Sequence, residues 1–171
     1  LTSIIWNAKK YPAFYSFSSS PFYDIRTQIT EFIIGENVTS IPAYMCYGMC
    51  NLKSISIPNN VISIGSSAFS GCSGLTSITW NAKNYPAFSN YSSSPFYNIR
   101  TQITKFIIGD EVTSIPSYMC YEMSNLESVT IGNSVSSIGS SAFYNTRIKS
   151  LTIGSGIQTI ASDAFSYKST N

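Results

Sequence analysis

The chain has 171 residues, of which 43% are hydrophobic and only 11% are charged, and its formal net charge is +2. A balance so close to neutral provides no basic field for nucleic acid or for an anionic membrane surface. The chain contains no histidine, which excludes Ser-His-Asp and Cys-His catalysis and most zinc sites.

A long segment of the sequence occurs twice. The segment Trp6–Gly35 returns almost unchanged as Trp80–Gly109, after 74 residues. Around it, residues 1–74 align with residues 75–147 apart from one deletion near the end of the second copy. Self-similarity at a fixed spacing is the signature of repeat architectures. We therefore expect the fold to be built from stacked, equivalent units.

A shorter pattern of about 23 positions lies inside each copy and is clearest in residues 52–74. Its apolar positions 1, 4 and 6 predict a short strand with one buried face, which Pro58 ends because proline cannot donate to a sheet ladder. Val61 and Ile64 then return to the interior on a second extended leg. Ala-Phe at the next apolar position predicts a short helical or 3-10 turn that places Phe69 in the core.

The same frame divides the whole chain into seven units. The two longest units carry about five inserted residues between their strand and the Pro-Phe pair. The expected units are residues 1–28, 29–51, 52–74, 75–102, 103–125, 126–147 and 148–171. No unit can bury its apolar face alone, so stacking is required, and the strands then pair as a parallel sheet with about 4.8 Å between neighbours. The predicted fold class is a β-rich solenoid.

The pattern L-x-S-I-x-I-P-x-x-V-x-S-I-G-x-x-A-F-x-x-C, complete in Leu52–Cys72, resembles the leucine-rich repeats of BspA-type bacterial surface proteins. The resemblance covers essentially the whole chain and implies one leucine-rich repeat solenoid domain over residues 1–171, at the cell surface or secreted. The sequence starts directly on a predicted strand without Met. We expect it to be a piece of a longer array, with any secretion signal upstream. No apolar run approaches 18 residues, so we expect no membrane insertion of this segment.

The four cysteines are expected to be free rather than paired in two disulfides. Cys46 and Cys120 occupy the position that holds Phe69 in the regular unit, and a free cysteine behaves as a small buried apolar residue. These two cysteines lie three units apart, about 14 Å by the strand spacing, which is beyond disulfide reach. A bridge between Cys50 and Cys72 in adjacent units stays open as an alternative.

No catalytic motif survives inspection. The phosphate-binding patterns G-x-x-x-x-G-K-[ST] and G-x-G-x-x-G do not occur. The repeat frame spreads the acidic residues apart, so we expect no pair of carboxylates at the distance that a glycosidase needs. Asp110 and Glu111 are adjacent, but they fall in a turn, where solvation is the simpler explanation. The sequence therefore predicts no enzyme, no cofactor and no metal site.

The two inserted loops contain aromatic residues that the core pattern does not require. They are Tyr11, Phe14, Tyr15 and Phe17 in the first loop and Tyr85, Phe88 and Tyr91 in the second. Either these rings form a satellite core beneath the longer loops, or some stay exposed as ligand contacts, since aromatic rings anchor protein interfaces and receive sugars. Both loops should lie on one side of the solenoid, about 14 Å apart.

Two further sets of apolar residues belong to the strands. Trp6 and Trp80 fall on the inward sixth position, so we expect both in the core. Ile5, Ile33 and Ile107 fall on the outward fifth position and would form a small apolar patch. Ile33 and Ile107 therefore join the loop aromatics as candidate ligand-binding residues.

These observations predict a non-catalytic binding or adhesion module. Its expected partner is a surface or matrix protein of a host or a neighbouring cell, because a solenoid offers an extended contact surface. A glycan-binding module and a structural spacer within a larger surface protein remain alternatives. Fold alone does not select the ligand.

Overall fold

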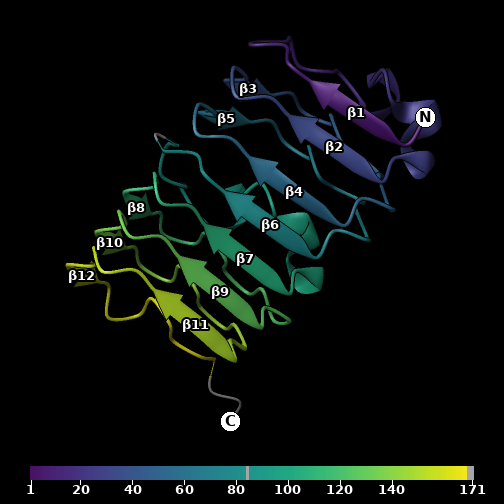
Figure 1. Cartoon of the computed structure of the whole chain (residues 1–171). Helices are drawn as coiled ribbons and strands as arrows, with labels where there is room; N and C mark the ends of the chain where they lie inside the picture. The colour runs from purple at the N-terminus through teal and green to yellow at the C-terminus, as the bar shows by residue number, and fades with distance from the viewer. Residues whose placement is uncertain (84, 169–171) are drawn as a thin grey trace.

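The computed structural model describes residues 1–83 and 85–168, and it shows seven four-residue strands stacked side by side (Figure 1). The first and last of these strands lie at opposite ends of the stack. The strands are β1 (Ser3–Trp6), β2 (Glu31–Ile34), β4 (Ser54–Ile57), β6 (Ser77–Trp80), β7 (Lys105–Ile108), β9 (Ser128–Ile131) and β11 (Ser150–Ile153). The predicted leucine-rich repeat solenoid of about seven repeats is confirmed.

The strand pairs are parallel and in the register that the repeat frame requires. Ile78 of β6 pairs with Phe106 of β7, and Phe106 pairs with Val129 of β9. All three side chains are buried, because the fourth position of each unit faces the interior. Equivalent residues thus lie beside each other, and the apolar positions of successive units merge into one continuous core.

The sheet is interrupted once within the described residues. Strands β4, β6, β7, β9 and β11 form one five-stranded sheet and β1 and β2 form another, but β2 and β4 share no hydrogen-bonded ladder. A hollow of about 420 Å³ lies there, lined by Phe32 and Ile33 on one side and by Ser54 and Ser56 on the other. We call this boundary between β2 and β4 the seam.

The second extended legs form their own short parallel pairs at the side of the stack (Figure 1). These two-residue strands are β3 (Ser40–Ile41), β5 (Ser63–Ile64), β8 (Ser114–Ile115), β10 (Ser137–Ile138) and β12 (Thr159–Ile160). Strand β3 pairs with β5, and β10 pairs with both β8 and β12. In the part of the chain that the structure describes, the two longest units lack such a strand and carry 3-10 helices instead.

The four 3-10 helices are η1 (Phe17–Ser19), η2 (Tyr23–Gln28), η3 (Tyr91–Ser93) and η4 (Tyr97–Gln102). In the regular units the equivalent segment around Phe69 is a series of hydrogen-bonded turns. Ser67 and Gly71 there have positive φ values of 57° and 75°, which lie outside the helical region and interrupt any regular helix.

The core contains the side chains that the unit pattern places inward. Phe69 and Trp80 are buried, and both contact the buried ring of Phe96, at centroid distances of 5.5 and 6.0 Å. Trp6 is only half-buried, so its predicted burial in the core is confirmed only in part. The reason is that its strand β1 has a neighbouring strand on one side only.

All four cysteines are free, so the Cys50–Cys72 bridge that the sequence left open is absent. The Cys72 thiol donates instead to the backbone oxygen of Cys46, at 2.9 Å. Burial raises the pKa of Cys72 to about 12. Burial also raises the pKa of Cys46 and of Cys120 well above the ordinary range, so these three thiols stay protonated at neutral pH.

Candidate binding surface

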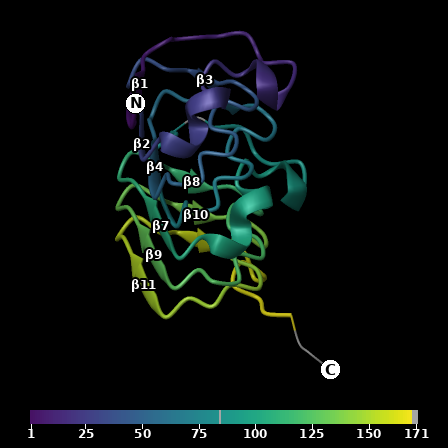
Figure 2. The same ribbon diagram turned by 90° about the vertical axis from the view of Figure 1, so that its right-hand side faces the viewer.

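Both inserted loops lie on the same side of the solenoid, as the sequence predicts. The 3-10 helices of the two loops face the viewer together in Figure 2 and stand at the right of the stack in Figure 1. Each loop is anchored to the turn of the following unit. The Ser20 hydroxyl donates to the Met45 oxygen at 3.4 Å, and the Ser94 hydroxyl donates to the Met119 oxygen at 3.3 Å.

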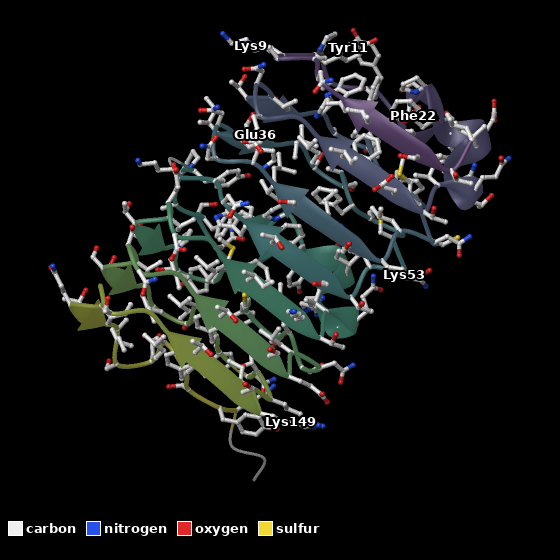
Figure 3. All side chains as sticks on the ribbon, in the orientation of Figure 1. Lys9, Tyr11, Phe22, Glu36, Lys53 and Lys149 are labelled. Carbon is white, nitrogen blue, oxygen red and sulfur yellow. The ribbon has the colours of Figure 1, made fainter. Side chains whose placement is uncertain are left out.

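The first tyrosine of each loop packs against the tryptophan of the preceding strand, although Tyr11 is still 41% exposed whereas Tyr85 is half-buried. Tyr11 and Phe22, both labelled in Figure 3, meet the Trp6 ring edge-on at 5.3 and 6.2 Å. In the second copy Tyr85 meets Trp80 in the same way at 5.0 Å. The Tyr85 hydroxyl also accepts a hydrogen bond from the Ile64 backbone N–H at 3.2 Å, and burial raises the pKa of this phenol.

The next phenylalanine of each loop follows the same pattern. Phe14 is half-buried and Phe88 is buried, and each contacts the tyrosine three residues before it at 5.6 Å. Such rings form a satellite core under the loops. Of the candidate contact residues, Phe88 therefore offers no ring surface to solvent.

The second half of each loop faces outward. Tyr15 is fully exposed, at 100%, and Phe17 and Tyr91 are exposed at equivalent positions of the two copies. Shallow hollows of about 290 and 260 Å³ lie against the two loops, the first lined by Tyr11 and Tyr15 among others and the second by Tyr85. The loops thus combine an inward packing half with an outward half.

A column of tyrosines runs along the turns beside the loops. Each stands directly after the core position that Phe69 occupies in the regular unit. They are Tyr23, Tyr47, Tyr97, Tyr121 and Tyr144. All five are half-buried. Ser70 and Ser166 hold the same position in units 3 and 7, so the column is divided into a first and a second group.

Stacked aromatic rings connect the column to the loops. Phe17 stacks on Tyr47 at 5.1 Å and 20°, and Tyr91 stacks on Tyr121 at 5.0 Å and 22°. Tyr121 in turn stacks on Tyr144 at 5.0 Å and 12°. The spacing of neighbouring units, about 4.8 Å, explains the Tyr121–Tyr144 stack, because these rings hold equivalent positions on adjacent turns. The rings that stack on Tyr47 and on the other face of the column at Tyr121 come from the loops.

We call this surface the tyrosine face. Its first cluster consists of Phe17, Tyr23, Tyr44 and Tyr47, and its second cluster consists of Tyr91, Tyr97, Tyr118, Tyr121 and Tyr144. Every member is exposed or half-buried. The face is therefore an accessible array of contacting rings, and all of them except Phe17 carry a hydroxyl group.

Two arginines add positive charge to the tyrosine face. The Arg26 guanidinium lies 3.8 Å above the Tyr23 ring, and the Arg100 guanidinium lies 4.0 Å above the Tyr97 ring. Partial burial, followed by the nearby Glu122 carboxylate and the neighbouring rings, raises the pKa of Tyr121. This phenol is therefore neutral and able to donate a hydrogen bond at physiological pH.

The structure does not bring the outward isoleucines together with the tyrosine face. Ile33 is exposed beside Ile5 in the β1–β2 pair, whereas Ile107 is half-buried beside Thr79 in the β6–β7 pair. Both isoleucines belong to the strands, and the aromatic rings belong to the turns and loops. The predicted patch is therefore not formed as one surface, since Ile5 and Ile33 lie in one sheet and Ile107 in another, and all three lie apart from the aromatic clusters.

Sequence reasoning from the loops alone missed most of the tyrosine face. The missed residues are Tyr23, Tyr44, Tyr47, Tyr97, Tyr118, Tyr121 and Tyr144. The signal was present in the repeat alignment, because tyrosine recurs at one position after the core slot in five of the units. Side chains at equivalent positions of stacked units must lie side by side.

Neither a metal cluster nor a membrane span is found in residues 1–83 and 85–168. These residues contain no group of three or more Cys, Asp or Glu side chains placed to hold a metal ion. No helix in the same ranges has both the length and the hydropathy needed to cross a bilayer.

Parallel strands stacked in register, one to each of the seven units, define a leucine-rich repeat solenoid. The sequence model of the BspA type leucine rich repeat region matches residues 39–171 in six copies, and the chain belongs to this family. The match begins within the second unit, so the first long unit lies outside it.

One solved structure agrees with this fold, and a second is similar to the chain in sequence. A leucine-rich repeat protein from Eubacterium ventriosum ATCC 27560 is 21% identical, with a TM-score of 0.50, over 96% of this chain and 57% of that one. A leucine rich cell surface protein from Faecalibacterium prausnitzii A2-165 is 22% identical, with a TM-score of 0.43, over 97% of this chain and 51% of that one. This chain thus spans little more than half the length of either protein. No functionally curated protein matches it.

Proposed function

We propose that the chain is a non-catalytic binding module, displayed at a cell surface or secreted, that contacts a protein partner through the tyrosine face. The observation that carries the proposal is the accessible array of stacked rings on one side of the solenoid. Surface or secreted location rests on the resemblance to BspA-type surface proteins.

The composition of the tyrosine face favours a protein partner. Tyrosine supplies a large contact area with little loss of side-chain entropy, and its hydroxyl adds a hydrogen bond, which is why it is enriched in binding hot spots. The rings here are already held by stacking and by the guanidinium contacts of Arg26 and Arg100. A preorganised surface loses little freedom on binding, so its contacts contribute more fully to affinity.

The two clusters also favour an extended partner. They recur three units apart, about 14 Å along the solenoid, and one protein chain that touches both gains from the high effective concentration of the second contact. A glycan is the second candidate, because the shallow hollows against Tyr11 and Tyr85 are bounded by aromatic rings that a sugar ring can stack on.

A screen against two kinds of array tests the proposal. The folded chain is applied to arrays of extracellular and matrix proteins and to arrays of polysaccharides and oligosaccharides. We expect a protein ligand with a dissociation constant of about 10 µM or tighter. Binding to glycans alone would replace the proposal by the second candidate, and binding to neither array would contradict both and favour a spacer.

A matched variant controls for non-specific adhesion. Tyr15 is fully exposed but lies outside the tyrosine face, and the equivalent position of the second copy is Ser89. The change Tyr15→Ser therefore removes an exposed ring in a way that the chain itself tolerates. We expect Tyr15→Ser to leave protein binding unchanged. Loss of protein binding in this variant would mean that the exposed loop tip carries the contact.

A further inference from the structure

The two copies of the tyrosine face provide an internal comparison. They keep the arginine and the tyrosine beneath it, Arg26 with Tyr23 and Arg100 with Tyr97, but they differ in the residue opposite the arginine. The first copy has Gly48 at this position, and the second copy has Glu122. The copies also differ at Asp24, which is Asn98 in the second copy, and at Phe17, which is Tyr91. The residue opposite the arginine is the difference that decides whether the guanidinium has a carboxylate partner.

In the second copy the arginine has a carboxylate partner. Arg100 donates through Nη1 to the Tyr97 backbone oxygen at 2.9 Å, and its Nη2 lies 3.5 Å from Oε2 of Glu122. The two side chains are 25% and 31% exposed. The pair is thus partly shielded from water, where a charge-assisted contact is stronger than on an open surface.

Glu122 lies at a turn position that takes a positive φ value in four of the units. Its φ value is 54°, in the left-handed region that favours glycine, and the equivalent residues are Gly48, Gly71 and Asn145. A glutamate is rarely found there. Its presence in the turn beside Arg100, with its carboxylate directed to the guanidinium, marks this position as one where a carboxylate fits.

In the first copy the same guanidinium lacks such a partner. Arg26 donates to the Tyr23 backbone oxygen and covers the Tyr23 ring, but the two ion pairs of the described residues, Arg100–Glu122 and Lys149–Glu127, do not include it. Asp24 lies on the same 3-10 helix and is exposed. Gly48 has no side chain to offer. The remaining N–H donors of Arg26 are therefore available.

We propose that Arg26, together with the rings of Phe17, Tyr23 and Tyr47, binds an acidic side chain of the partner protein. In the second copy Glu122 occupies the equivalent site, so that copy is closed by the chain itself. The proposal rests on the proposed function, since it assigns to the tyrosine face a protein partner with an aspartate or glutamate in its contact segment.

The internal pair also favours a protein carboxylate over an acidic sugar. The group seated on Arg100 is a glutamate side chain, so the site as built accepts a carboxylate at the end of a flexible aliphatic stem. In the first cluster Phe17 contacts both Tyr23 and Tyr47, and the arginine lies over the Tyr23 ring. They would cover the aliphatic part of such a side chain while the guanidinium takes its carboxylate.

A titration with defined probes tests this site without the natural partner. Hexaglutamate is added to the isotope-labelled chain, and the Nε–Hε resonances of Arg26 and Arg100 are followed by nuclear magnetic resonance. Hexaglutamine is the neutral control, and an oligogalacturonate is the acidic-sugar arm. We expect hexaglutamate to shift the Arg26 resonance with one site per chain and to bind at least about tenfold more tightly than hexaglutamine.

Swapped variants make the test specific. Gly48→Glu installs in the first copy the residue that the second copy already carries, and it should abolish the shift of Arg26. Glu122→Gly opens the second copy, and it should add a site at Arg100, so that two peptides bind per chain. Asp24→Asn gives the first copy the residue that Asn98 provides in the second, and removal of this exposed negative charge near the site should tighten binding.

A further variant, Arg26→Gln, covers the case in which Gly48→Glu disturbs the turn, and melting temperatures show that each variant is folded. Equal binding of both hexapeptides, tighter binding of the oligogalacturonate, or a shift unaffected by Gly48→Glu and Arg26→Gln would overturn the assignment. Failure here with the array binding intact would leave the proposed function standing. A positive titration with no partner in the arrays would support the site alone.

Discussion

The packing of the phenylalanine column can be tested by one substitution in two environments. Phe69 is fully buried and stacks on Phe96 at 5.5 Å, whereas Phe165 holds the equivalent position in the seventh unit and is 38% exposed. Phe69→Ala removes a ring that is enclosed by neighbours on both sides, so both the transfer free energy and a cavity term are lost. We expect the free energy of unfolding to fall by about 3–5 kcal/mol.

The same change at Phe165 should cost much less, about 1–2 kcal/mol, because over a third of the ring is already in water and the site leaves no closed cavity. Ser54→Ala on the outward sheet face should cost under about 0.5 kcal/mol. Urea unfolding followed by circular dichroism measures all three values. Similar losses for Phe69→Ala and Ser54→Ala would show that the inward and outward assignment of the repeat is wrong.

Three further predictions concern the thiols and the seam. A thiol reagent at neutral pH should label only Cys50 of the four free cysteines in the folded chain, since it is half-exposed while the others are buried; rapid labelling of a second thiol would contradict the burial. The pKa of the Cys72 thiol is raised from 9.0 to about 12 in the folded chain, so on raising the pH this thiol ionises first in the unfolded chain. Its contribution to the free energy of unfolding is therefore intact below pH 9 and is lost between pH 9 and 12, by about 1.4 kcal/mol per pH unit. The melting temperature should therefore fall above pH 9, and less so in Cys72→Met, which copies Met49 and Met123 of the equivalent slot; a pH-independent value would refute this. Finally, the Lys53 amide at the seam should exchange with deuterium at least about tenfold faster than that of Glu127, which donates to the Thr104 oxygen at 2.9 Å; equal protection would show that β2 and β4 are paired in solution.

The strands and their register were predictable because they follow from local spacing. Apolar residues at positions 1, 4 and 6 of each unit specify a short half-buried strand, and stacking of units strand on strand places Ile78 beside Phe106, because both hold the fourth position of their unit. The burial of Phe69 and of Cys46 followed from the same column. These features depend only on what each unit shares with its neighbours.

Other features depend on what a unit does not share. Trp6 is half-buried because β1 has a neighbouring strand on one side only. The sequence pattern of the first unit does not indicate that the unit lies at the end of the stack. The Cys72 thiol turns to a carbonyl of the unit before it rather than to Cys50, which adjacency in sequence does not determine. The seam likewise has no signature in the periodicity of β2 and β4.

The tyrosine face was predictable in part. The loop residues Phe17 and Tyr91 were identified because they exceed what the core pattern needs. The stacking of Tyr121 on Tyr144 was not, because it arises only when half-exposed positions of successive turns are brought to about 5 Å. Reading each column of a repeat for solvent-facing as well as core positions would have revealed it.

Binding by a variant of the tyrosine column tests the account most directly. The triple change Tyr47→Ser, Tyr121→Ser and Tyr144→Ser gives these turns the residue that Ser70 and Ser166 already provide at the same position, so the solenoid should keep its fold. We expect an unchanged far-ultraviolet circular dichroism spectrum and a melting temperature within a few degrees of that of the parent chain. Biolayer interferometry against the protein found in the screen should then show affinity weakened by about 100-fold or more, since several hot-spot rings are removed together. Affinity retained within about threefold of the parent chain, in a variant that is folded, would contradict a binding role for the tyrosine face.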